Sequence, residues 1–148
     1  MGRNVRMRTL GALLGGVAGV FATGVSAEEG LPKSLSCAFT SGTSWSYEAG
    51  DFKSKVPTAL SFTIDKIDLD GQSAVLNANG EGVGAKLSVV RAINANHFLE
   101  AVNEGFLNLT TVYDKDASNG KYPAVHSRHF GLLGQPVFSQ YTGFCTAQ

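Results

Sequence analysis

The feature of this sequence that most constrains its fold is a short-range alternation of apolar and polar residues, which begins near residue 35 and continues almost to the end. In the segment 60–69 the apolar residues occupy even positions as far as Ile64 and odd positions from Ile67 onward. A period of two places successive side chains on opposite faces of a strand, whereas a helix needs a period of about 3.6. The change of phase predicts a β-bulge near Asp65 and Lys66.

About eight or nine such runs follow one another, and residues typical of turns separate them. The predicted strands are residues 35–40 and 44–52, residues 60–69, a strand that starts at Ala74, and residues 86–92, 97–102, 106–113, 122–130 and 137–146. The predicted turns lie at Gly42, at Asp70-Gly71, at Asn79-Gly80, and at residues 94–96, 103–105 and 131–136.

Short strands in unbroken succession are typical of an all-β antiparallel meander. We expect a small meander of about eight or nine strands that forms a closed or nearly closed barrel, with a β-sandwich as the alternative. Residues 97–104 also fit a short helix capped by Asn96 and ended by Gly105. A strand is the preferred interpretation of that segment.

The first 27 residues have the pattern of a secretory signal peptide. Arg3, Arg6 and Arg8 give this segment a positive start. A Gly-rich apolar stretch follows from Leu10 to Phe21, and Val25-Ser26-Ala27 has small residues at the positions that signal peptidase reads. We expect cleavage after Ala27, which leaves residues 28–148 as a single β domain. The Gly- and Ala-rich composition of the leader favours a bacterial protein that is periplasmic or secreted. An uncleaved membrane anchor is the alternative.

The charge of the chain argues against several kinds of partner. The sequence has 12 basic and 12 acidic residues, and three of the basic ones lie in the predicted signal peptide. The mature domain is therefore mildly acidic, and it has no run of lysines or arginines. We expect it to bind neither nucleic acid nor an anionic membrane surface, and to have no stable membrane insertion after cleavage.

The chain has two cysteines, Cys37 near the start of the predicted domain and Cys145 near its end. Export would bring both into an oxidising compartment, so we expect a disulfide between them. Such a bond forms readily when the first and last strands are neighbours, as they are in a closed barrel. The alternative is a metal-binding or catalytic pair, but cysteines this far apart have no ligand spacing.

The densest polar cluster is His126-Ser127-Arg128-His129, inside a β-like run. Alternation puts His126 and Arg128 on one face and His129 on the other, so the two histidines do not converge on a metal ion. We interpret His126 and Arg128 as a patch that binds an anionic group, with Tyr122 and Tyr141 as further ligand-binding candidates. The alternative is a solvated face on which Arg128 pairs with a nearby carboxylate.

No motif indicates a cofactor, a metal ion or a catalytic residue. Asp68-Leu69-Asp70-Gly71 resembles part of a calcium loop, but the alignment puts Lys66 and Asn77 at positions where acidic ligands belong. The glycines of residues 80–84 lack the spacing of a phosphate loop. The chain also has no Gly-x-Ser-x-Gly sequence. We therefore expect no cofactor and name no catalytic residue.

Three segments of the chain resemble small exported bacterial proteins of unknown function, and Gly42 with Trp45 resembles the Gly-x-Trp of lipocalins with one residue more between them. The first resemblance implies export and a β fold, and it implies no catalytic residues. Its segments are Phe106 to Tyr113, Ala124 to His129 and Phe138 to Cys145.

We expect an exported binding protein that holds a small apolar or amphipathic ligand or presents its loops to an envelope protein. This expectation follows from the predicted architecture. The alternatives are an enzyme that uses His126 and Arg128 for acid–base or anion-stabilising chemistry, and a structural component of the envelope.

Overall fold

The computed structural model describes residues 30–78, 84–102, 105–132 and 134–148, and these residues form nine strands and no helix. The predicted signal peptide and the predicted turn at Asn79-Gly80 lie outside them. Among the described residues, no helix has the length and apolar character needed to cross a membrane. The strands are β1 (Leu35–Glu48), β2 (Asp51–Lys55), β3 (Leu60–Asp68), β4 (Ser73–Asn77), β5 (Ala85–Arg91), β6 (Ala95–Val102), β7 (Phe106–Tyr113), β8 (Tyr122–Leu132) and β9 (Gln135–Ala147).

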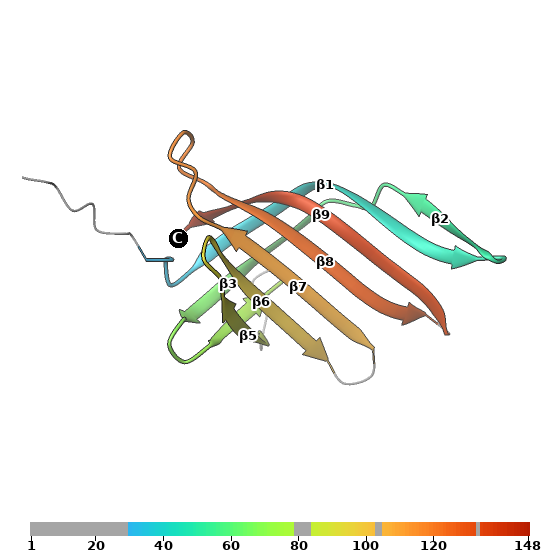
Figure 1. The fold of residues 1–148 in the computed structure, drawn as a ribbon, viewed down its shortest axis with the longest axis horizontal. Coiled ribbons are helices and arrows are strands. Elements are labelled where there is room, and N and C mark those ends of the chain that lie inside the picture. Colours follow the sequence, from blue (N-terminus) through green and yellow to red (C-terminus); the bar gives the residue numbers. More distant parts are fainter. Residues whose placement is uncertain (1–29, 79–83, 103–104, 133) are drawn as a thin grey trace, which may run out of the picture. The chain divides into compact units, whose positions relative to one another are not determined.

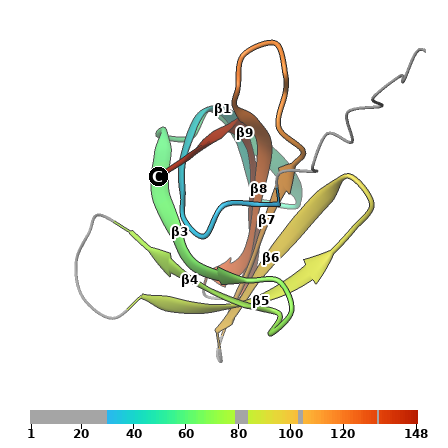
Figure 2. The same cartoon turned by 90° about the vertical axis from the view of Figure 1, so that its left-hand side faces the viewer.

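Eight of these strands close into an antiparallel barrel. From β3 to β9 each strand pairs with the next along the chain, and β1 pairs with both β3 and β9, which joins the two edges of the sheet. Figure 2 shows the strands arranged in a ring. The predicted all-β meander and closed barrel are confirmed, and the β-sandwich alternative is wrong.

The remaining strand, β2, lies outside the barrel because β1 extends beyond the part of it that pairs with β3. The first part of β1 pairs with β3 as far as Phe39, and its last part, from Ser44 to Glu48, pairs with β2 along the same edge. In Figure 1, β2 lies beside the far end of β1, away from β3. All five residues of β2 are exposed.

The predicted turn at Gly42 is wrong, because β1 continues through this residue. The register with β9 shifts between Phe39 and Ser41, and the strand ends only at Glu48, before a turn at Ala49 and Gly50, whose φ angles are 50° and 85°. A Cβ at Gly42 would lie 2.7 Å from the backbone oxygen of Gln140. This glycine therefore allows the close approach of β9 and does not turn the chain.

The predicted strand over residues 44–52 is wrong beyond Glu48, because the chain turns at Ala49 and Gly50 and β2 begins at Asp51. The other predictions about strands agree with the structure in most details. Residues 95–102 form a strand, so the helix alternative is wrong for this described segment. A bulge between β3 and β4 lies where it was predicted, with Lys66 at a φ of 52°. The predicted turn over residues 131–136 is too long, since β8 and β9 extend to Leu132 and from Gln135.

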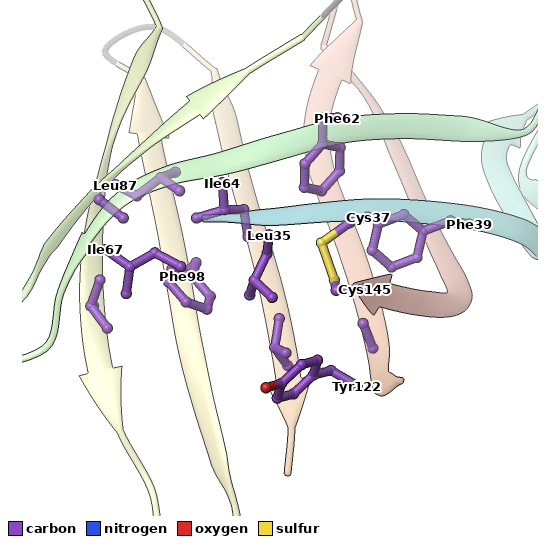
Figure 3. Close-up of a cluster of buried hydrophobic side chains, with 14 of the residues drawn as sticks. Leu35, Cys37, Phe39, Phe62, Ile64, Ile67, Leu87, Phe98, Tyr122 and Cys145 are labelled. Carbon is purple, nitrogen blue, oxygen red and sulfur yellow. A yellow bond between two sulfur atoms is a disulfide. The ribbon is translucent and has the colours of Figure 1, made fainter. Parts of the chain in front are cut away.

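The apolar core fills the part of the barrel that contains the disulfide. Cys37 and Cys145 face each other in the register of β1 and β9 and are bonded, as predicted. Figure 3 shows the bond beside Phe39, with Tyr122 below Cys145. The other fully buried side chains of this core are those of Leu35, Ile64, Ile67, Leu87, Val89, Phe98 and Val112.

Candidate functional site

The barrel has a cavity of about 280 Å³ that lies further along the strands than the disulfide and the apolar core. This volume is just below the usual range of small-molecule pockets, which begins at roughly 300 Å³. The lining is mixed in chemistry, with polar and charged groups on some strands and apolar groups on others. The side chains that line it include Leu60, Phe62, Leu76, Ala78, Glu100, Val102, Phe106, Asn108, His126 and Arg128.

A row of polar residues crosses five strands, and its members on β6, β7 and β8 form one wall of the cavity. Ser44 of β1 pairs with Ser139 of β9, which pairs with Arg128 of β8, and the row continues through Asn108 of β7 to Glu100 of β6. Residues paired across antiparallel strands lie on the same face of the sheet. All five side chains therefore belong to the inner face of the barrel, and we call this set the polar row.

His126 lies one inward position deeper than the polar row and is 3% exposed. Its Nδ1 lies 2.8 Å from Oγ1 of Thr110, and its ring packs near the rings of Phe39 and Phe62 at centroid distances of 5.6 Å and 5.1 Å. Burial and then the nearby charge of Arg128 lower the pKa of His126 to about 4. The imidazole is therefore neutral at pH 7.

The bond to Thr110 also indicates which ring nitrogen of His126 carries the proton. The Thr110 hydroxyl has no other hydrogen-bond partner among the described residues, so we assign it as the donor to Nδ1. A neutral imidazole that accepts at Nδ1 carries its proton on Nε2. Within the described part of the chain Nε2 has no partner, and it is the donor that His126 offers to the cavity.

Asn108 and Glu100, at the β6 end of the polar row, are linked by a hydrogen bond. The Asn108 amide Nδ2 donates to Oε2 of Glu100 at 2.7 Å. The Asn108 oxygen Oδ1 is buried and has no partner among the described residues. A buried acceptor without a donor costs about 1–3 kcal/mol, so this atom marks a place where a donor from a bound molecule would be favourable.

Arg128 is a charged group without a counter-ion in the described structure. No carboxylate of the described residues lies within 4.0 Å of its guanidinium. The predicted alternative, a pairing with a nearby carboxylate, is therefore absent from this part of the chain. Arg128 presents its donors to the cavity from the middle of the polar row.

The opposite side of the cavity is apolar. Leu60 and Phe62 come from β3, and Leu76 comes from β4, two residues after the buried Ala74. Val102 and Phe106 form an apolar rim, because they pair with each other at the ends of β6 and β7. The cavity therefore has a polar wall from β6, β7 and β8 and an apolar wall from β3 and β4.

The structure brings three of the four predicted ligand-binding residues together. His126 and Arg128 line the cavity, and Tyr141 is buried beside His126, with ring centroids 6.1 Å apart. Tyr122 lies elsewhere, buried in the core opposite Cys145. Tyr141 and Tyr122 do not line the cavity.

His129 points to the outer face, as the alternation predicted, and stacks on Phe138 at 6.3 Å. Among the described residues no group of three or more His, Cys, Asp or Glu side chains is placed to hold a metal ion. Sequence reasoning missed Asn108, Glu100 and Thr110. Alternation along β7 could have shown that Asn108 and Thr110 share a face of that strand. Only the register of β6, β7 and β8 shows that Glu100 and Arg128 lie on the same face of the sheet.

Comparisons with known protein families, with curated proteins and with solved structures found no match.

Proposed function

We propose that this protein is an exported bacterial binding protein that holds a small amphipathic molecule in the barrel cavity. The observation that carries the proposal is the division of the cavity into a polar wall and an apolar wall. A ligand that is apolar at one end and polar at the other matches both walls at once. Pockets of this kind combine apolar lining with a few oriented polar groups.

The size of the cavity limits the ligand. At roughly 30 Å³ for each water of the liquid, 280 Å³ is the space of about nine waters. The proposed ligand accordingly has about nine non-hydrogen atoms within the cavity.

Two observations support export to the periplasm or the exterior. Residues 1–27 have the pattern of a signal peptide. The disulfide between Cys37 and Cys145 is of the kind that persists in oxidising compartments and is rare in the cytosol.

Binding has more support than catalysis at this site. Thr110 occupies one ring nitrogen of His126, and burial keeps the ring neutral. The hydroxyl that is hydrogen-bonded to His126 among the described residues is that of Thr110, which is 2% exposed and does not line the cavity, so this pair presents no activated nucleophile to a bound molecule.

The proposal can be tested by NMR titration of the mature protein with isohexanol, a small uncharged amphipathic alcohol. We expect amide shifts at Leu60, Phe62 and Leu76 on the apolar wall and at Asn108 and Arg128 on the polar wall, with residues far from the cavity unaffected. Leu76→Trp should abolish these shifts by filling the cavity, and Ala78→Trp serves as a second blocking variant. The matched control is Val90→Trp, because Val90 is exposed and does not line the cavity.

Shifts that survive in both blocking variants would place the alcohol elsewhere and contradict the proposal. Absence of shifts in the folded wild-type protein would also contradict it.

A further inference from the structure

We propose that the ligand is a zwitterion, namely a free α-amino acid with an apolar side chain of about the size of leucine. This inference rests on the proposed function, since it names the class of molecule that the cavity would hold. Its basis is the distribution of charge along the polar row.

The polar row contains one cation and one anion that are held apart. Arg128 and Glu100 lie on β8 and β6, with β7 between them. Neighbouring strands are about 4.8 Å apart, so the two backbones are separated by roughly 10 Å. The two side chains form no ion pair within 4.0 Å.

Separated opposite charges select against ligands with a single charge. A simple carboxylate would be attracted by Arg128 and repelled by Glu100, and a simple amine would experience the reverse. A molecule with both charges on neighbouring atoms can satisfy the two residues together.

The hydrogen-bonding groups of the cavity fit the same ligand. An ammonium group has three donors, and Glu100 with the partnerless Oδ1 of Asn108 provides acceptors for them. A carboxylate has only acceptors, and Arg128 with Nε2–H of His126 provides donors. The polar wall of the cavity therefore has acceptors on β6 and β7 and donors on β8.

The apolar wall accounts for the rest of the molecule. Leu60, Phe62 and Leu76 face the cavity from β3 and β4. The cavity of 280 Å³ has space for about nine waters, and leucine has about that many non-hydrogen atoms. An isobutyl side chain against this wall leaves the two charged groups at the polar row.

The test compares leucine with three probes that lack one or both of its charged groups. Isothermal titration calorimetry of the mature protein would compare leucine with isocaproate, which lacks the ammonium group, with isoamylamine, which lacks the carboxylate, and with isohexanol, which has neither charge. We expect leucine to bind most tightly. Loss of either charged group should weaken binding about 10-fold to 100-fold, because hydrogen bonds to charged groups contribute about 1.5–3 kcal/mol.

Two variants assign the charges to residues. In Glu100→Gln the advantage of leucine over isocaproate should disappear, and in Arg128→Gln the advantage of leucine over isoamylamine should disappear. Arg91→Gln is the matched control, because Arg91 does not line the cavity and its nearest carboxylate is that of Asp70 at 3.7 Å. Circular dichroism confirms that each variant is folded.

The outcomes separate this inference from the proposed function. If isocaproate or isohexanol binds as tightly as leucine, the zwitterion inference is wrong while the amphipathic cavity stands. If no probe binds and the wild-type protein is folded, both are wrong. Leucine binding that is unchanged in Arg128→Gln and Glu100→Gln would also overturn the inference.

Discussion

Reduction of the Cys37–Cys145 disulfide should strongly destabilise the barrel. The bond joins the first barrel strand to the last, and the two cysteines are 108 residues apart in the sequence. In the chain-entropy model a crosslink over a loop of this length restricts the unfolded chain by about 4–5 kcal/mol. For a domain of this size that corresponds to a fall in melting temperature of roughly 15–20 °C.

The assay is urea unfolding of the oxidised and the reduced wild-type protein, followed by circular dichroism. Reduction leaves every other side chain in place, so loss of packing contributes little to the difference. The reduced protein should also show a larger m-value, because its unfolded state is less compact. The double variant Cys37→Ala/Cys145→Ala is the control and should not respond to the reductant.

A difference of less than about 1 kcal/mol between the oxidised and reduced forms would refute this reasoning. It would mean that the paired strands β1 and β9 keep the ends of the chain together even when the rest of the barrel has unfolded.

Three further predictions concern single residues. The pKa of His126 is lowered from 6.5 to about 4, so between these pH values the unfolded chain binds a proton at this residue and the folded chain does not. The free energy of unfolding, measured with urea, should therefore be constant above about pH 6.5 and fall by about 3 kcal/mol as the pH drops to 4. His126→Gln should remove this pH dependence. Phe98→Ala should cost about 3–5 kcal/mol in the same assay because Phe98 is 1% exposed, whereas Phe52→Ala, at a residue that is 49% exposed, should cost well under about 1 kcal/mol. Gly143→Ala should lower the melting temperature markedly because its Cβ would meet backbone atoms of β1, while Gly131→Ala, with nothing nearer than 3.9 Å, should be tolerated.

Much of the fold could be predicted from local sequence signals. The period of two and the turn residues predicted the meander, and the phase change predicted the bulge at Lys66. The predicted count of strands agrees with the structure only because the wrong turn at Gly42 divided β1 into two, while β2 was not predicted as a separate strand. Gly42 could not be interpreted correctly because a glycine that turns the chain and a glycine that admits a neighbouring strand look the same in one sequence. Only the pairing of β1 with β9 separates the two.

The site was less predictable than the fold. Alternation alone placed His126 and Arg128 on one face, and both line the cavity. Glu100 and Asn108 lie beside Arg128 because of the register of β6, β7 and β8. This register depends on contacts between residues far apart in the sequence, so local patterns did not predict it. Tyr122 shares the inner face with His126 but lies in the core beside the disulfide. The sequence could not show this difference, because a period of two predicts the face of a strand on which a residue lies and not its depth within the barrel.

The most direct test of an exported, disulfide-linked barrel that holds a small ligand is mass spectrometry of the protein produced with its own leader and purified gently from the periplasm. The account predicts a denatured chain that begins at Glu28 and is two hydrogens lighter than the thiol form. It also predicts a native mass with an added small molecule that is lost on denaturation and is missing from Leu76→Trp. A full-length chain with free thiols, or a native mass equal to that of the polypeptide alone, would contradict it.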